Sequence, residues 1–244
     1  MRILKDVYLV GSGQIGLSHP FDCHVYLIDG GEELALVDSG AGMEVKFLLA
    51  NVRGDGLDRE RIKKILLTHH HADHSGGCAH LLERIEAKIF LHSAGVDLVE
   101  DGDEERMGLT TAKRSGAYSA GYMFSPFQVD TALEHGGSVQ VGRYSLEVHH
   151  VPGHSPDSVC FRMDTDEGPV MFSGDTVFFG GKIGLLNRVG SNLQDYREHF
   201  GKLGALEVEA LLPAHHLFVL RGGKRQIEMA EEALKGIQPP PNAF

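Results

Sequence analysis

The sequence predicts an α/β protein in which short strands alternate with amphipathic helices. Two patterns support this class: β-rich runs bounded by Gly and Asp, and stripes of apolar residues at i, i+3, i+4 and i+7. The composition, with 42% hydrophobic and 23% charged residues among 244, is that of a globular chain. No apolar run approaches the roughly 20 residues of a membrane-spanning helix. We therefore expect a single domain over residues 1–244 that does not enter a membrane.

The first half of the chain passes from strands to alternating helices and strands. Short runs rich in Val, Leu, Ile and Tyr, separated by turn residues, predict the strands. Helical stripes at 45–52 and 78–85 predict helices that each pack one face on a sheet. The expected order is strands at 7–10, 24–28 and 33–38, a helix at 45–52, a strand at 65–67, a helix at 78–85 and a strand at 88–92.

The second half returns to sheet and closes with two helices. Turn-rich segments such as PGHSPD and DTDEG separate the strand runs. The last helix is expected to stop at Gly236, with Pro239 just beyond it. The expected order is strands at 138–142, 144–151, 158–163 and 169–175, a helix at 196–203, a strand at 209–215 and a helix at 227–234.

Residues 94–128 do not fit this pattern. They lack a clean period and contain the acidic run EDGDEER, followed by four aromatic residues, Tyr118, Tyr122, Phe124 and Phe127. Such a segment is either an insertion that packs on its own side chains, or a lid or wall of a substrate pocket. If the aromatic residues were exposed, a homodimer would be expected to cover them.

The net charge indicates which partners the protein can bind, and the cysteines indicate its cellular compartment. The chain has 23 Lys and Arg against 34 Asp and Glu, a net charge of −11, which would repel a nucleic-acid backbone. Cys23, Cys78 and Cys160 are far apart and odd in number, which favours a reducing compartment over a disulfide framework. The first residues lack the apolar core of a signal peptide. We expect a cytoplasmic protein that does not bind nucleic acid.

Histidine is unusually frequent, with 15 residues, and several of them gather in HHHADHSGG at 69–77. His69 and His71 are two apart, so in extended chain they face the same side, while Asp73 and His74 enter the next helix. Imidazole nitrogens and a carboxylate oxygen suit zinc, and also manganese or iron. The motif predicts a metal site at the end of the preceding strand.

Three further polar residues follow apolar strands in the same way. His154, Asp175 and His215 each come just after a β-rich run and a tight turn of small residues. In layered α/β folds, loops at strand ends converge on one pocket. A solvated histidine-rich turn would not explain these additional donors, so we expect them to share the metal site.

These residues resemble the pattern of the metallo-β-lactamase superfamily, and the resemblance runs from LIDGGEELALVDSG at 27–40 to PAHH at 213–216. It implies a four-layer αβ/βα sandwich of two mixed β-sheets flanked by helices. It also implies two divalent metal ions, with zinc the first expectation and iron or manganese the alternatives. By position, the implied ligands are His69, His71 and His154 for one ion, Asp73, His74 and His215 for the other, and Asp175 bridging both.

Two such ions would enable the protein to catalyse hydrolysis. Ions about 3.5–4 Å apart can hold a hydroxide between them and polarise the oxygen of the bond under attack. The expected reaction is cleavage of an ester or thioester of a small molecule, with Asp175 and Asp73 as the catalytic carboxylates. Asp73 lies beside the water and could accept its proton. Asp38 in LVDSG is expected to support a ligand histidine rather than bind metal.

Within the superfamily the chain is most similar to glyoxalase II. Three histidines run together at 69–71, and the bridging aspartate opens GDTVFFGGKIG at 174–184. Lys182 lies near where that family places basic residues against a substrate carboxylate, so it is a candidate substrate-binding residue. After His215 only one helix is expected, where glyoxalase II has a helical carboxy-terminal domain. An aspartate at position 175 disfavours a true β-lactamase.

Three alternatives stay open. VPGHSPD at 151–157 is similar to a lactonase sequence, although Phe178 stands where those enzymes commonly have tyrosine. Persulfide dioxygenases keep similar residues and bind one iron through the equivalents of His69, His154 and Asp175. A complete metal site can also stabilise a binding protein that has no catalytic activity.

Overall fold

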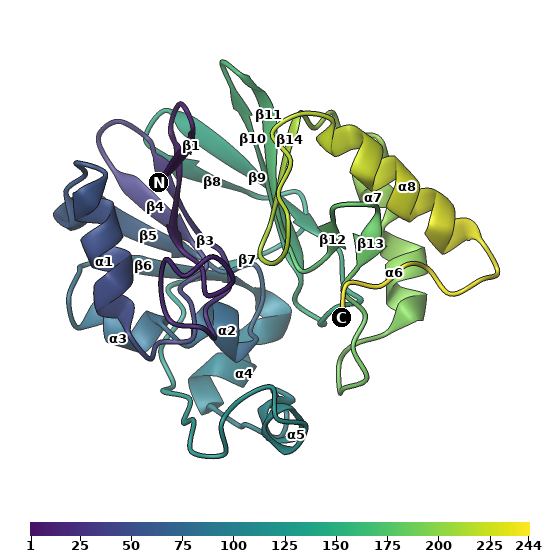
Figure 1. The fold of residues 1–244 in the computed structure, drawn as a ribbon, viewed down its shortest axis with the longest axis horizontal. Helices are drawn as coiled ribbons and strands as arrows, with labels where there is room; N and C mark the ends of the chain where they lie inside the picture. The colour runs from purple at the N-terminus through teal and green to yellow at the C-terminus, as the bar shows by residue number, and fades with distance from the viewer. The chain divides into compact units, whose positions relative to one another are not determined.

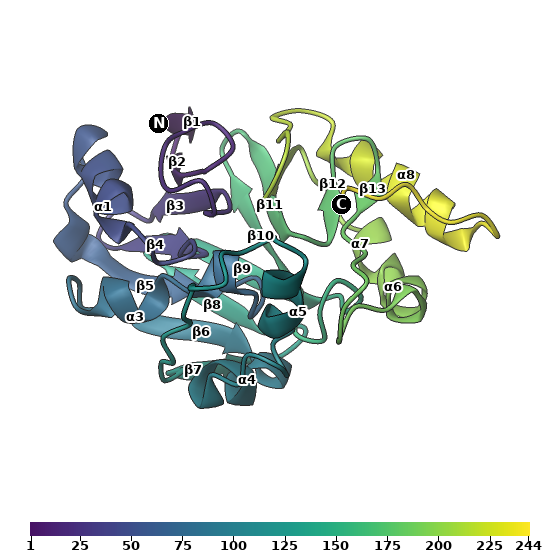
Figure 2. The same cartoon turned by 60° about the horizontal axis from the view of Figure 1, so that its bottom comes forward.

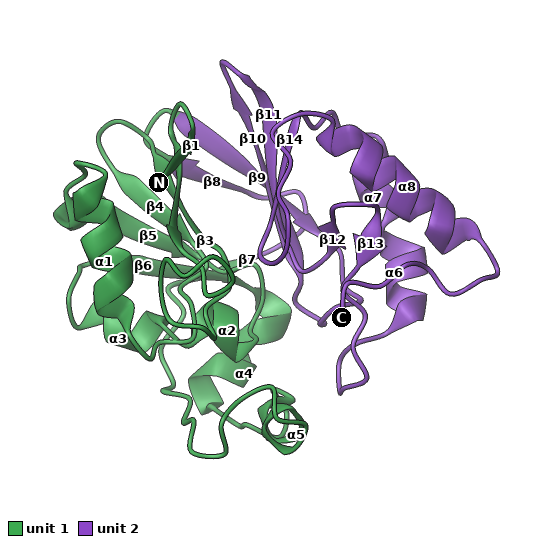
Figure 3. Ribbon diagram, viewed as in Figure 1, with its two compact units in different colours: residues 1–132, 141–143 green, residues 133–140, 144–244 purple.

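Each of two parts of the chain is built on its own β-sheet. The computed structural model describes residues 1–244 and contains two compact units (Figure 3). The amino-terminal unit comprises Met1–Ala132 and Val141–Arg143, and the carboxy-terminal unit comprises Leu133–Gln140 and Tyr144–Phe244. No helix in the chain is both long and apolar enough to cross a membrane.

The amino-terminal unit contains a seven-stranded mixed sheet whose strands lie in sequence order. The first four strands pair antiparallel, and β4, β5 and β6 pair parallel. Parallel pairing fits the sequence because a helical connection separates these strands. The strands are β1 (Arg2–Leu4), β2 (Val7–Gly11), β3 (Val25–Asp29), β4 (Leu34–Val37), β5 (Ile62–Leu66), β6 (Lys88–His92) and β7 (Thr131–Leu133).

The helices of this unit confirm the predicted stripes. In α1 (Val45–Gly54) the four apolar residues at 45, 48, 49 and 52 are all buried, and Figure 1 shows the helix running beside the sheet. Helix α3 (Cys78–Leu82) is shorter than predicted, but Ile85 is still buried in the turn that follows. The short helix α2 (Ala72–Ser75) follows β5. Residues 94–128, expected to be aperiodic, contain α4 (Val96–Asp101) and α5 (Leu109–Arg114).

The carboxy-terminal unit contains a five-stranded mixed sheet in the order β14-β11-β10-β9-β8. Strands β9, β10 and β11 pair antiparallel, whereas β11 and β14 pair parallel. Strands β9, β11 and β14 therefore run in the same direction and end at the same edge of the sheet. The strands are β8 (Ser138–Val141), β9 (Tyr144–His150), β10 (Val159–Thr165), β11 (Gly168–Gly174) and β14 (Ala210–Pro213); β12 (Val177–Phe178) and β13 (Lys182–Ile183) form a separate hairpin.

Three helices lie together on one side of this second sheet (Figures 1 and 2). They are α6 (Leu193–His199), α7 (Gly201–Gly204) and α8 (Gly223–Lys235). The single helix predicted at 196–203 is divided near Gly201, because glycine without a side chain weakens a helix interior. Helix α8 ends at Gly236 as predicted, and Ile227, Ala230 and Leu234 pack into the core of the unit.

Helix α8 provides a test of this core. Ile227 is fully buried, whereas Met229 on the same helix is 41% exposed. Ile227→Ala should lower the free energy of unfolding by about 2–5 kcal/mol because it leaves a cavity in packed surroundings. Met229→Ala should change it by less than about 0.5 kcal/mol. Denaturant titration of both variants measures the difference, and equal losses would contradict this packing.

Candidate metal centre

The amino-terminal unit gathers four of the predicted ligands just beyond the end of β5. The rings of His69 and His71 lie on the same side of the chain, with His69 Nε2 and His71 Nδ1 3.0 Å apart. His74 from α2 lies beside them, and its ring centroid is 4.0 Å from that of His69. Asp73 Oδ2 is 3.5 Å from His74 Nε2. Three imidazoles and one carboxylate thus converge on one place.

Asp38 orients this group from the neighbouring strand. It follows β4 with a φ of 64°, a left-handed conformation that Asp tolerates better than most residues. Its carboxylate accepts hydrogen bonds from Thr68 N–H at 2.8 Å and from His74 Nδ1 at 3.0 Å. A carboxylate can only accept, so Nδ1 of His74 carries the proton and Nε2 keeps its lone pair. Asp38 supports a histidine, as the sequence predicted.

Thr68 fixes the second histidine through the same carboxylate. Its hydroxyl donates to Asp38, at 2.9 Å from Oδ2, and lies 3.1 Å from His69 Nδ1. Because the hydroxyl has one proton, which goes to Asp38, it accepts a hydrogen bond from His69 Nδ1–H. Nε2 of His69 therefore also presents a lone pair on the side of His71.

The carboxy-terminal unit gathers the other three predicted ligands. His154 follows β9, Asp175 follows β11 and His215 follows β14, so all three lie at the edge where these parallel strands end. Asp175 Oδ2 lies 3.4 Å from His154 Nε2 and 3.6 Å from His215 Nε2. Two imidazoles therefore share one oxygen of a carboxylate that is 5% exposed.

A main-chain carbonyl sets the orientation of His154. Its Nδ1 lies 2.5 Å from the carbonyl oxygen of Gly184, so Nδ1 donates and Nε2 keeps its lone pair. This approach requires glycine, because a Cβ at position 184 would lie 2.2 Å from the carbonyl oxygen of Asp175. The Tyr196 hydroxyl donates to that oxygen and accepts from Gly184 N–H. The buried Tyr196 thus links the main chain of Asp175 to that of Gly184, whose carbonyl orients His154.

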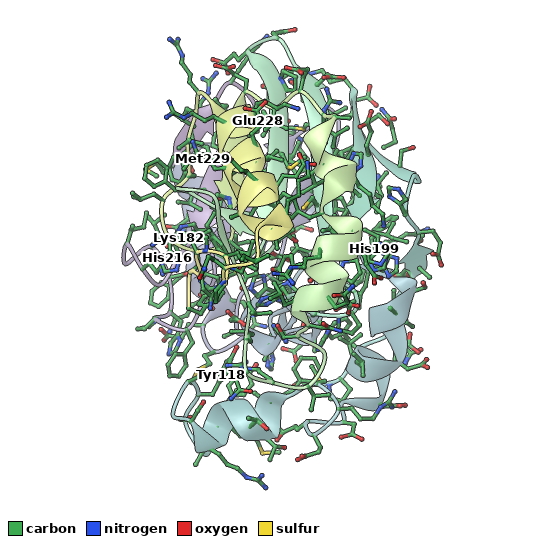
Figure 4. The ribbon with its side chains drawn as sticks, turned by 90° about the vertical axis from the view of Figure 1, so that its right-hand side faces the viewer. Tyr118, Lys182, His199, His216, Glu228 and Met229 are labelled. Atoms are coloured by element: carbon green, nitrogen blue, oxygen red, sulfur yellow. The ribbon has the colours of Figure 1, made fainter.

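Lys182 and three rings surround the carboxy-terminal donors. Figure 4 shows Lys182 next to His216, whose pKa is lowered mainly by burial and also by the neighbouring His215 and Lys182. The Phe178 and Phe244 rings pack edge to face, with centroids 5.6 Å apart. Phe244 also lies 5.8 Å from the ring of His215. This donor set therefore has an apolar flank beside one lysine.

Hydrogen bonds hold Phe244 at this place. Its chain segment lies along β13, where Ile183 N–H donates to the carbonyl of Pro241 at 3.0 Å and Ala243 N–H donates to the carbonyl of Ile183 at 2.9 Å. The Asn242 side chain adds two bonds to the main chain of Leu185. The Phe244 side chain is still 51% exposed, so part of its ring can meet a ligand.

The sequence did not predict a contact between residues 94–128 and the donors. The Tyr118 hydroxyl donates to Asp73 Oδ1 at 2.6 Å and accepts from Asp73 N–H at 2.9 Å. Burial, and next the Asp73 carboxylate, raise the pKa of Tyr118 well above its ordinary value, so the hydroxyl stays protonated. The aromatic cluster was the only signal in the sequence, and it did not indicate a partner.

One of the three cysteines lies close to the donors of the amino-terminal unit. Cys23, Asp38 and His74 have possible ligand atoms within 4.8 Å of one another. Asp38 and His74 of this group are already hydrogen-bonded to each other, and burial raises the pKa of the Cys23 thiol far above its ordinary value. Cys78 and Cys160 have pKa values raised to about 12 by burial. All three thiols are buried, and none forms a disulfide, as the sequence predicted.

The two donor sets fit a divalent metal ion. Histidines that bind metal commonly donate their second nitrogen to a carboxylate, a carbonyl or a similar acceptor, which fixes the lone pair on the first. His69, His74 and His154 all follow this rule. Neutral imidazoles with carboxylate oxygens are the ligands of zinc, iron and manganese sites.

Comparison with known proteins identifies the family. The model of the metallo-beta-lactamase superfamily matches residues 19–215, which include every predicted ligand. The chain belongs to the metallo-beta-lactamase superfamily, a family of metallo-hydrolases. The acyl-coenzyme A thioesterase MBLAC2 of Bos taurus is 30% identical over 227 residues, which are 85% of this chain and 77% of the relative.

Other superfamily members are similar over different lengths. A hydroxyacylglutathione hydrolase of Anaeromyxobacter dehalogenans is 31% identical over 160 residues, 66% of this chain and 48% of the relative. The crystal structure of BJP-1, a subclass B3 metallo-beta-lactamase of Bradyrhizobium japonicum, has a TM-score of 0.69 and 26% identity. That match covers 88% of this chain and 76% of the lactamase. The predicted fold class, an α/β metallo-β-lactamase fold with two mixed sheets and flanking helices, is confirmed.

The role of Asp38 can be tested without disturbing the backbone. Asp38→Asn keeps the size and tolerates the left-handed conformation, but it removes the charge that holds His74 and Thr68. Zinc affinity should fall about 10–100-fold, as for other supporting groups of metal ligands. Competition with a chromophoric chelator measures this loss.

Asp22→Asn provides the matched control for this test. Asp22 is another buried carboxylate of the same unit, and it accepts hydrogen bonds from the main chain of His19 and Ala41. The Asp22→Asn substitution should leave the zinc affinity unchanged. The same affinity in Asp38→Asn and in the unaltered protein would contradict the orienting role of Asp38.

Proposed function

We propose that this protein is a metal-dependent hydrolase that cleaves acyl thioesters carried by small anionic molecules. The observation that carries the proposal is the orientation of the donors: hydrogen bonds of Nδ1 in His69, His74 and His154 leave the lone pair on Nε2 of each ring. A protein that used these histidines only for packing would have no need of this arrangement. The thioesterase name of the 30% identical relative supports the choice of substrate.

In this proposal the ligands expected from the sequence hold two ions, with zinc as the first candidate. His69, His71 and His154 would hold one ion, Asp73, His74 and His215 the other, and Asp175 both. When bound, such a pair lowers the pKa of a water molecule toward neutrality and polarises the carbonyl under attack.

The residues of the chain have separate tasks in the reaction. Asp73 would lie beside the attacking water as the acceptor of its proton, while its Oδ2, the oxygen that faces His74, would hold the ion. Asp175 keeps His154 and His215 together through its own Oδ2. Thr68 and Asp38 keep the imidazoles in one orientation, so little reorganisation is needed during the reaction.

The flank of the carboxy-terminal donors supports a thioester with an apolar acyl group and a negatively charged carrier. Phe178 and Phe244 offer aromatic surface to the acyl chain. Lys182 is exposed beside them and would attract a carboxylate or phosphate of the carrier. This proposal keeps Lys182 in the substrate-binding role expected from the sequence.

Metal removal tests the reaction type. Protein reconstituted with zinc should hold about two equivalents per chain and hydrolyse an acyl-coenzyme A, and chelation should abolish the activity. His71→Ala should lose metal and activity together, whereas His80→Ala, which alters a partly exposed histidine of α3, should keep both. Full activity in His71→Ala, or one equivalent of iron without thioester hydrolysis, would contradict the binuclear hydrolase.

Lys182 tests the substrate class. Lys182→Ala should lower kcat/KM for an anionic acyl thioester about two- to fivefold, because an exposed ion contact contributes about 0.2–1 kcal/mol. The same variant should hydrolyse a neutral thioester at the unaltered rate, which is the internal control. Steady-state assays should also show higher kcat/KM for the thioester than for a lactone or a β-lactam. A higher kcat/KM for the lactone or for the β-lactam than for the thioester would overturn the thioester assignment.

A further inference from the structure

A tyrosine from the aperiodic segment 94–128 reaches one of the proposed ligands. Tyr118 makes two hydrogen bonds to Asp73 through a single oxygen, as donor to Oδ1 and as acceptor from the main-chain N–H. The side chain of Tyr118 is 7% exposed, so little water competes for these bonds. The hydroxyl therefore ties the carboxylate of Asp73 to its own main chain.

These bonds divide the two oxygens of Asp73 between different partners. Oδ1 accepts from Tyr118, while Oδ2 lies 3.5 Å from His74 Nε2. A carboxylate without the first bond could turn about its side-chain torsions, present either oxygen or bind through both. Because Tyr118 holds Oδ1, only Oδ2 points toward His74 and is available as a metal ligand.

The packing around Tyr118 keeps the hydroxyl in register with Asp73. Its ring lies 5.2 Å from that of Tyr122 and 5.8 Å from that of Phe21. The Tyr122 hydroxyl donates to the carbonyl of Ala41 at 2.9 Å. This bond requires glycine at position 76, where a Cβ would lie 2.3 Å from that hydroxyl. The segment is therefore anchored at two places: at Asp73 in α2, and at Ala41 next to Gly76, the residue that follows α2.

We propose that Tyr118 is a positioning residue for Asp73: its hydroxyl holds the carboxylate with Oδ2 toward the histidines and so strengthens the binding of the ion that Asp73, His74 and His215 would share. This inference rests on the proposed function only in treating Asp73 as a ligand. It gives residues 94–128 a task at the metal centre, in addition to any role as a wall of the substrate pocket.

Tyr118→Phe removes both hydrogen bonds and keeps the ring in its packing. The affinity for the second equivalent of zinc should fall about 10–100-fold, while the first equivalent, which does not use Asp73, should bind as before. Chelator competition resolves the two equivalents. The visible spectrum of the cobalt-substituted protein should change at the second equivalent only, because the geometry around that ion alters.

Tyr122→Phe is the matched control, since it removes one buried hydroxyl from the same segment without touching Asp73. Urea titration should give both variants similar losses of stability, but only Tyr118→Phe should change the second equivalent. Unaltered zinc affinity and cobalt spectrum in Tyr118→Phe would overturn the inference. An equal change in both variants would also overturn it, because the effect would then come from the segment as a whole.

The same measurements separate this inference from the proposed function. If the unaltered protein binds two zinc ions and Tyr118→Phe weakens the second, the positioning role holds even when no thioester is hydrolysed. If the unaltered protein hydrolyses thioesters and Tyr118→Phe binds zinc normally, only the positioning role fails. Absence of zinc binding in the unaltered protein would overturn both.

Discussion

The donors of the amino-terminal unit depend on one buried carboxylate. Asp38 is 1% exposed, and a charge at such a position is stable only when its oxygens are fully hydrogen-bonded. The parallel pairing of β4 with β5 supplies the partners, because Asp38 and Thr68 both follow these strands and Asp38 N–H donates to the carbonyl of Leu66. The need to satisfy one charge thus fixes Thr68, and with it the direction of His69 and His74.

In the carboxy-terminal unit, neutral acceptors rather than a buried carboxylate orient the ligand histidine. There a carbonyl, that of Gly184, orients His154, and the Tyr196 hydroxyl joins this glycine to Asp175. Small residues make this possible: a Cβ at Gly153 would lie 2.4 Å from the ring of Tyr196. The glycine-rich turns after the strands therefore allow close approach between the donors and the groups that hold them. These glycines are needed because they leave room for neighbouring groups as well as for their backbone conformation.

Local patterns explain how much of this could be predicted from the sequence. Periodic apolar residues and runs of β-branched residues depend on neighbours a few positions away, so the main strands, α1 and α8 were predictable, as was the histidine group at 69–74. Short elements such as β12 and β13 have too few residues to show a period. The bond between Tyr118 and Asp73 joins residues 45 positions apart, and no local pattern records such a pair.

The separation of supporting groups along the chain also explains why the donors can be rigid. Asp38, Thr68 and Tyr118 come from three segments, and they bond to His74, His69 and Asp73 respectively. A loop such as 67–71 loses conformational entropy when its side chains are ordered. Here the hydrogen bonds of Asp38, Thr68 and Tyr118 add to the order of this loop and of α2, since they tie the donor side chains to the sheet and to the segment 94–128. The folding energy of the sheet thus supports the chemistry at its edge.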